Sequence, residues 1–250
     1  MREFRAIGES LPKAYHNALH LLNMAKDLNG IVPCPDWNCV QLECSITMVV
    51  ENPLEEPRIS RLIPCGPKEL QKYVLEILWG IMDFEIERGN WSYTYHDRFA
   101  GQIEDVIEEL KRNRYTRRAC MTIRLPEDIQ SNDPPCLQHI QFFVRENKLD
   151  MYVLFRSNDA VKATYMNAFA LIELQKVVAG AIGVDVGSYV HRANSFHCYE
   201  KDFGLLEQYD KRIVSGSGLT YRYDEEWQDD MESSIPDIMR EVAMLRRENG

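Results

Sequence analysis

The order of periodic segments in the middle of the chain constrains its fold most strongly. Three strand-like runs at 119–125, 140–145 and 149–155 precede an apolar helical run at 165–178, and another strand-like run follows at 188–195. The helical run is long enough for about four turns. Strands and helices mixed in this order predict a fold of the α+β kind.

The flanking segments extend the same mixture. Apolar residues at helical spacing predict helices at 10–29, 69–83 and 102–112, and the β-branched run at 40–50 predicts a further strand. The stretch 51–67 contains four prolines and is expected to form a long loop.

Two other segments have a distinctive composition. Residues 88–99 are aromatic, polar and irregular, which is typical of a surface loop that carries binding residues. Residues 224–250 are first acidic and then helical, and we expect them to end in an exposed last helix.

The overall composition narrows the class of protein. With 250 residues, of which 45% are hydrophobic and 27% charged, the chain matches an ordinary folded protein, and a single domain over 1–250 is favoured over two small ones. The formal net charge of −10 argues against a sequence-independent grip on DNA or RNA, because such binding needs a basic surface.

The chain also lacks the usual signals for a membrane or a secretory pathway. It has no run of about 18 apolar residues, and its N-terminus lacks the apolar core of a signal peptide. We therefore expect a cytoplasmic protein whose seven cysteines are free thiols. Cys34, Cys39 and Cys44 are evenly spaced, but nothing nearby completes a four-ligand set, so no metal site is predicted.

Cys136 is the strongest candidate for chemistry. It follows two prolines directly before a predicted strand, and the prolines would fix the backbone that carries the thiol. A thiol attacks as its thiolate, so nearby cations must lower its pKa, and Arg117, Arg118 and Arg156 are the candidates. From the local residues alone, a lone cysteine packed in the core is the alternative interpretation.

Two pairs of polar residues have equally open interpretations. Arg117 and Arg118 lie between a predicted helix and a strand, where two guanidinium groups can bind phosphate oxygens, although an exposed solvated pair is the alternative. His197 and Tyr199 are two residues apart on a strand and should point to the same face. They can donate to one sugar hydroxyl, or each can be a satisfied core residue.

In combination and in order, these segments resemble the thymidylate synthase family. PPCLQHIQFFV at 134–144 is similar to the family's nucleophile strand, and RSNDAVKATYMNAFALIEL at 156–174 is similar to its nucleotide-binding turn and helix. HCY at 197–199 resembles the sugar-binding His-x-Tyr. TRRA at 116–119 resembles the arginine pair that crosses the dimer interface, and LEILW at 75–79 resembles the helix that bears the active-site glutamate.

The resemblance implies a fold and an assembly. Its core motifs span 70–205, and it looks closest to the archaeal, methanogen-type branch of the family. It implies one catalytic domain with a mixed β-sheet flanked by helices, and a homodimer with a sheet face at the interface. In that dimer Arg117 and Arg118 would reach into the site of the partner. The tail at 224–250 diverges from the family.

The resemblance also implies a reaction. In this family the cysteine adds to C6 of a pyrimidine nucleoside monophosphate, and C5 then attacks a methylene group carried by a reduced pterin. Cys136 is thereby implied as the nucleophile. The implied reaction is the reductive methylation of dUMP to dTMP. The implied co-substrate is 5,10-methylenetetrahydrofolate or a tetrahydromethanopterin analogue, with no metal.

The remaining implied roles concern proton transfer and binding. Glu76 would organise proton transfers, and Asp159 and Trp79 would contact the pterin. Asn167 would read the base, and because an amide both donates and accepts, it favours uracil. The remaining implied substrate-binding residues hold the phosphate or the sugar, or lie on the nucleophile strand. They are Arg117, Arg118, Arg156 and Ser157 for the phosphate, His197 and Tyr199 for the sugar, and Gln141 on the nucleophile strand.

The sequence departs from the family pattern at several positions. Leu137 stands where most members have a histidine, Ala163 replaces a glycine, and Phe155 replaces a glutamine. The usual N-terminal phosphate-binding arginine is not recognisable, and Arg58 or Arg61 is the expected substitute. The C-terminus does not resemble the tail that closes over the cofactor.

Two other functions are left open by these departures. If water rather than hydride traps the exocyclic methylene, the product is a hydroxymethylpyrimidine nucleotide made from dUMP, dCMP or CMP. A missing closing tail favours this outcome, because such a lid excludes water. The other alternative is an inactive relative that binds a nucleotide or RNA, which the intact Cys136, Asp159 and Asn167 argue against.

Overall fold

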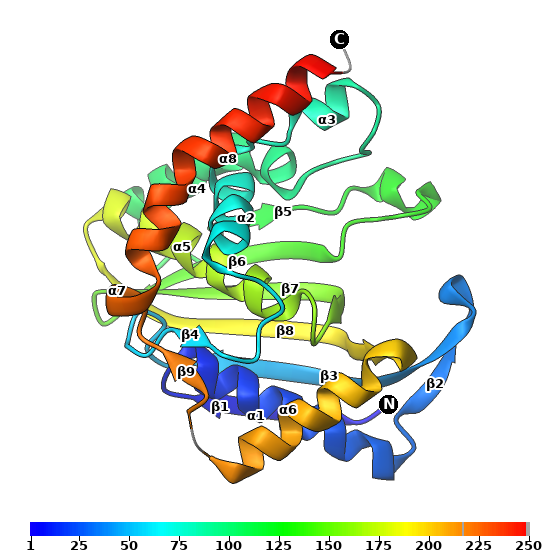
Figure 1. The fold of residues 1–250 in the computed structure, drawn as a ribbon. Helices are drawn as coiled ribbons and strands as arrows, with labels where there is room; N and C mark the ends of the chain where they lie inside the picture. The colour runs from blue at the N-terminus through cyan, green and yellow to red at the C-terminus, as the bar shows by residue number, and fades with distance from the viewer. Residues whose placement is uncertain (217, 249–250) are drawn as a thin grey trace.

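The structure is a computed structural model that describes residues 1–216 and 218–248. A seven-stranded sheet runs through the middle of the molecule, with strand order β1-β3-β8-β7-β6-β5 and with β2 paired to β3 (Figure 1). Its strands are β1 Glu3–Gly8, β2 Ile31–Cys34, β3 Cys39–Val50, β5 Cys120–Thr122, β6 Leu137–Arg145, β7 Lys148–Asp159 and β8 Asp185–Tyr199. A two-stranded sheet joins β4 Ile59–Ser60 to β9 Thr220–Tyr221.

The sheet is mixed, as the sequence predicted. The β1–β3 and β7–β8 pairs are parallel, and the other pairs are antiparallel. The α-helices are α1 Leu11–Met24, α2 Pro67–Trp79, α3 Phe84–Glu87, α4 Tyr95–Arg112, α5 Thr164–Ile182, α6 Phe203–Ser215, α7 Tyr223–Glu226 and α8 Gln228–Glu248. Among the described residues, no helix is long and apolar enough to cross a membrane.

Burial alternates along the strands, so the two faces of the sheet differ. On β7, Leu149, Met151, Val153 and Phe155 are buried, and the residues between them are half-buried or exposed. This period of two places one face in the main core, where α5 packs on β7 and β8 and α1 packs on β1 and β3. The opposite face is half-exposed and includes Tyr152, which is 42% exposed.

The predicted start of one helix and the predicted end of another are wrong, because capping residues set these helix ends elsewhere. Helix α4 begins at Tyr95, inside the segment predicted as a loop to residue 99, because the Thr94 hydroxyl accepts a hydrogen bond from the Asp97 amide at 3.0 Å. The loop therefore covers only 88–94. Helix α2 ends at Trp79 rather than at residue 83, because Gly80 adopts φ 58°, the left-handed conformation that ends helices.

The last helix is not exposed along its whole length, which corrects the sequence prediction. Ile238 and Val242 are 0% and 2% exposed, and they pack in a second small core with residues of α2 and α3. Arg88 donates hydrogen bonds to the main-chain oxygens of Leu245, at 2.8 Å, and Arg246. Helix α8 therefore lies along α2, as Figure 1 shows.

Candidate active site

Cys136 lies at a turn that an arginine holds in place. The main-chain N–H of Arg156 donates to the Cys136 oxygen at 2.8 Å, so the turn is fixed where β6 and β7 pair. The Arg156 guanidinium donates to the oxygens of Pro135, at 3.1 Å, and Pro134, at 2.6 Å. Because the proline rings fix φ at 134 and 135, the double proline holds these two carbonyl oxygens in place for the arginine.

The Cys136 cavity, of about 560 Å³, opens beside this turn. Four of the residues singled out in the sequence line it together, namely Cys136, Arg156, Ser157 and Tyr199. Its other walls were not predicted from the sequence; they come from residues 132–134 and from the β2–β3 hairpin. In the hairpin, the Trp37 ring packs edge-on against Tyr199, with ring centroids 6.1 Å apart.

The surroundings of Cys136 in this chain favour its protonated thiol. Burial raises the pKa of the Cys136 thiol above its ordinary value, while the positive charge of Arg156 lowers it and Asp133 raises it again. Burial dominates, so one guanidinium does not suffice to make a thiolate at neutral pH. Any further positive charge that reaches this cavity would lower the pKa of the Cys136 thiol and favour its thiolate.

His197 lies next to Ser157 in the protein interior, and one of its ring nitrogens has no hydrogen-bond partner among the described residues. The side chain is 4% exposed, and its Nδ1 lies 3.5 Å from the Ser157 hydroxyl. Burial lowers the pKa of His197, so the ring is neutral. Within the described part of the chain its Nε2 has no partner, which leaves a buried atom for a ligand group. The rings of His197 and Tyr199 lie 4.8 Å apart, as expected for two positions on one strand face.

Glu76 lies in a second cavity, of about 430 Å³, which we call the Glu76 cavity. It adjoins the Cys136 cavity, because Asp133 lines both. Its walls include Tyr73 on α2 and the aromatic side chains of Trp91, Tyr93 and Tyr95. The sequence placed binding residues in this aromatic segment without singling out any of its side chains.

Burial raises the pKa of Glu76 from 4.5 to about 7, against the lowering effect of Lys72 and with a smaller raising effect of Asp83. A carboxyl group with this pKa can both take and give a proton at neutral pH. The sulfur of Cys136 and this carboxyl group thus lie in adjoining cavities.

The raised pKa of Glu76 should make the free energy of unfolding depend on pH. The folded protein keeps a proton that the unfolded chain releases between pH 4.5 and about 7, so this group makes stability fall as pH rises through that window. Glu76→Gln should raise the free energy of unfolding by about 1–3 kcal/mol near pH 8 and by little near pH 4.5. Urea unfolding at both pH values measures this. Glu87→Gln, at an exposed position on α3, controls for the lost charge; an equal gain there would contradict the assignment.

Asn167 and Asp159 are held by hydrogen bonds, and neither is among the residues that line the two cavities. Asn167, on α5, is 6% exposed, and its Oδ1 accepts a hydrogen bond from the Tyr73 hydroxyl. Oδ1 of Asp159 accepts from the amides of Val161, at 2.9 Å, and Lys162, at 2.8 Å, and so shapes the turn between β7 and α5.

The cavity that contains Cys136 is not lined by Arg117, Arg118 or Gln141. Both arginines are exposed in the segment before β5, at the edge of the sheet. Gln141 lies on the half-exposed sheet face, and its amide donates to the main-chain oxygen of Arg117 at 3.0 Å. Gln141 therefore holds the arginine segment and does not line either cavity.

The structure places three further residues, Trp79, Arg58 and Arg61, outside the two cavities. The Trp79 side chain is 70% exposed, and the tryptophan in the wall of the Glu76 cavity is Trp91 instead. Arg58 or Arg61 was expected to replace a phosphate-binding arginine, but neither is among the residues that line the two cavities. Arg58 is buried, pairs with Glu173 and packs on the Phe169 ring.

Arg61 likewise holds a neighbouring segment rather than a ligand site. Its Nε donates to the Thr220 oxygen at 3.1 Å, and its guanidinium lies 4.1 Å from the centre of the Tyr221 ring. Arg58 also lies over the Tyr223 ring, 4.9 Å from its centroid, so both arginines contact the segment that leads to α8.

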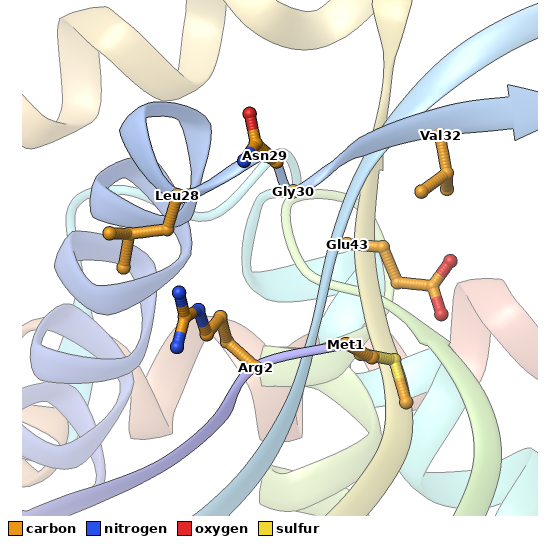
Figure 2. A pocket seen from close by; sticks show the side chains of 7 residues that line it. All are labelled: Met1, Arg2, Leu28, Asn29, Gly30, Val32 and Glu43. Carbon is orange, nitrogen blue, oxygen red and sulfur yellow. The ribbon is translucent and has the colours of Figure 1, made fainter.

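A further hollow, of about 390 Å³, lies at the N-terminus and is separate from both cavities. Figure 2 shows its lining side chains, in which Arg2 and Glu43 point away from one another. It contains no nucleophilic side chain and no converging charges among the residues that line it.

Comparisons with known proteins agree on one family. The family model described as thymidylate synthase matches residues 79–232. A protein named "Putative thymidylate synthase" from Methanocaldococcus jannaschii is 35% identical over 75% of this chain and 93% of its own length. One of the same name from Methanosarcina acetivorans is 31% identical over 67% of this chain and 78% of its own length. The expected likeness to methanogen-type relatives is thereby confirmed.

A solved structure supports the fold. The thermostable thymidylate synthase A from Bacillus subtilis superposes with a TM-score of 0.63 and covers 81% of this chain and 84% of its own. The two sequences are 20% identical, so this likeness concerns the fold alone. The predicted mixed sheet flanked by helices is confirmed.

Proposed function

This chain belongs to the thymidylate synthase family, and from that premise we propose that it methylates dUMP reductively to dTMP. Members of this family are transferases that add a one-carbon group to C5 of a pyrimidine nucleotide. The observation that carries the proposal is the single cavity lined by Cys136, Arg156, Ser157 and Tyr199, with a carboxyl group of pKa about 7 in the adjoining cavity.

Cys136 acts as the nucleophile in this proposal. Its thiolate forms a bond to C6 of the pyrimidine, and the electrons of the C5–C6 double bond move toward C5 and O4. C5 then forms a carbon–carbon bond with the methylene group of the donor and loses its proton, while the bond between that methylene carbon and the donor nitrogen breaks. In methylation the resulting exocyclic methylene takes up a hydride from the reduced pterin, which is thereby oxidised, and the sulfur leaves C6 as its thiolate. Glu76 takes and returns protons around the base during these steps.

The phosphate and the sugar are bound by the remaining residues of the Cys136 cavity. Arg156, Ser157 and Tyr199 line it. The buried His197, whose Nδ1 lies 3.5 Å from the Ser157 hydroxyl, is not among its lining residues, and in this proposal its free Nε2 accepts a hydrogen bond from a sugar hydroxyl that Tyr199 also contacts. The dianionic phosphate needs more positive charge than Arg156 supplies. Arg117 and Arg118 of the partner subunit supply it, and the same charges lower the pKa of the Cys136 thiol.

The dimer follows from the same requirement. Arg117 and Arg118 are exposed at the sheet edge and are not among the residues that line the Cys136 cavity of their own chain, so in this proposal they act across an interface. The half-exposed sheet face, with Tyr152 at 42% exposure, is the surface that a second copy would cover. A two-fold axis then brings each arginine pair into the other subunit's site.

The Glu76 cavity fits the flat heterocycle of a reduced pterin. Three aromatic side chains, Trp91, Tyr93 and Tyr95, line a cavity of about 430 Å³ that also contains carboxyl groups. The pterin supplies the methylene group and, in methylation, a hydride. Asp159, at the turn before α5, is the proposed contact for the pterin ring. Trp79 would contact the pterin only if its exposed side chain moved toward the Glu76 cavity.

Hydroxymethylation is the second candidate, and one observation favours it. Helix α8 packs along α2, and Arg88 binds its last turn. The described tail, which runs through residue 248, therefore contributes no lining residue to the Glu76 cavity or the Cys136 cavity. Where no segment covers these cavities, water can reach the exocyclic methylene before hydride does.

The products distinguish the two reactions. We expect the protein to convert dUMP to dTMP when it is incubated with 5,10-methylenetetrahydrofolate or methylenetetrahydromethanopterin, as read by product mass. Parallel incubations with dCMP, UMP and CMP test the base and the sugar. A hydroxymethyl nucleotide as the main product would replace the first candidate by the second.

A further inference from the structure

Tyr73 is a polar side chain that no sequence motif singled out. Its ring lines the Glu76 cavity, and its hydroxyl donates a hydrogen bond to Oδ1 of Asn167. We propose that Tyr73 is a positioning residue that fixes the orientation of the Asn167 amide and thereby sets a preference for uracil over cytosine nucleotides. This inference rests on the proposed function, in which Asn167 reads the base.

An amide can read either base, depending on which way it faces. Uracil presents the acceptor O4 and the donor N3–H, so it needs Nδ2 of Asn167 at O4 and Oδ1 at N3–H. Cytosine presents a 4-amino donor and the acceptor N3, which requires the opposite arrangement. A half-turn of the amide exchanges the two, because its nitrogen and oxygen occupy nearly equivalent positions. An amide that is free to turn therefore discriminates poorly.

The hydroxyl proton of Tyr73 prevents this half-turn. Burial raises the pKa of Tyr73 well above its ordinary value, so the proton is always present. Within residues 1–216 and 218–248, Oδ1 of Asn167 is the one acceptor to which the Tyr73 hydroxyl donates. If the amide turned, the hydroxyl could accept from Nδ2, but its own proton would lose the acceptor that it has in the described part of the chain. Loss of this hydrogen bond should disfavour the turned amide by about tenfold or more.

Both partners are held on rigid elements, and the second lone pair of the amide oxygen remains available. Helices α2 and α5, which carry Tyr73 and Asn167, pack directly against each other. A carbonyl oxygen has two lone pairs, so Oδ1 can accept from Tyr73 and from uracil N3–H together. The hydrogen bond therefore selects an orientation without blocking the reading of the base.

The test compares binding of dUMP and dCMP to wild-type protein and to Tyr73→Phe by isothermal titration calorimetry, with UMP and CMP in parallel. The phenylalanine keeps the ring and removes only the hydroxyl. We expect the preference for the uracil nucleotide to fall by about tenfold. Tyr165→Phe is the matched control, because Tyr165 lies on the same helix as Asn167, and its buried hydroxyl donates to the Arg58 oxygen instead. Tyr165→Phe should therefore keep the wild-type preference for uracil over cytosine nucleotides.

An Asn167→Ala background separates orientation from packing. With no amide to orient, adding Tyr73→Phe should leave the remaining preference unchanged, whereas a packing effect would persist. If Tyr73→Phe in the otherwise intact chain binds uracil nucleotides with the wild-type preference, Tyr73 has no positioning role and the proposed function stands. If the wild-type protein binds none of the four nucleotides, the proposed function fails, and this inference fails with it.

Discussion

Replacement of Cys136 by serine should lower turnover by about 1,000-fold or more and abolish the covalent adduct with 5-fluoro-dUMP. Removing an enzyme nucleophile commonly costs this much or more. A hydroxyl group ionises far less readily than a thiol, so the charges that make a thiolate cannot make an alkoxide. Turnover is measured with dUMP and the methylene donor, and the adduct is measured by the mass of the intact protein.

Cys65→Ser is the matched control for this substitution. Cys65 is also a half-buried free thiol, but it lines neither the Cys136 cavity nor the Glu76 cavity. The control variant should form the adduct at the wild-type rate. Adduct formation by Cys136→Ser would remove Cys136 from the chemistry. A wild-type protein that folds and binds dUMP but forms no adduct would support the inactive, nucleotide-binding alternative.

Replacement of Arg117 by alanine should lower kcat/KM for dUMP by about 100-fold, although this side chain lies outside the Cys136 cavity of its own protomer. Loss of one partner from a buried, hydrogen-bonded charge pair costs on the order of 2–5 kcal/mol. The effect requires that Arg117 reach the partner's phosphate site. Steady-state kinetics with purified protein measure it, and Arg114→Ala provides a control, because Arg114 binds Asn147 of its own chain at 2.9 Å.

Mixed dimers test the shared site directly. A hybrid of a Cys136→Ala subunit with an Arg117→Ala subunit contains one site in which both residues are intact. Random exchange of equal amounts should therefore restore about one quarter of the wild-type activity. Mixtures that stay inactive despite proven subunit exchange would place Arg117 and Cys136 in the same subunit's site, or would show that Arg117 is not used.

Much of the fold was predictable because local periodicity reflects local burial. The apolar run at 165–178 lies within α5, and the strand-like runs at 40–50 and 149–155 lie within β3 and β7. Strand β1 and helix α6 were not predicted. Strand β1 has only six residues, and its parallel pairing with β3 joins segments about forty residues apart, which no local pattern reveals.

The candidate site divides in the same way. The motifs around Cys136, Arg156 and Tyr199 named residues that do share one cavity. The hairpin wall with Trp37 and the hydrogen bond from Tyr73 to Asn167 were missed, because each joins residues far apart in the sequence. Arg58 was misassigned for a related reason. A sequence does not show that an arginine is buried against a carboxylate and an aromatic ring.

By itself, the sequence determined which residues are able to react and which segments become strands or helices, because nucleophilicity, hydrogen-bonding capacity and side-chain periodicity are properties of residues and their near neighbours. Only the tertiary structure decided how those residues are tuned. Burial raises the pKa of Glu76 to about 7 and also raises that of the Cys136 thiol. Desolvation and orientation depend on every element packed around a group, and that packing exists only in the folded chain.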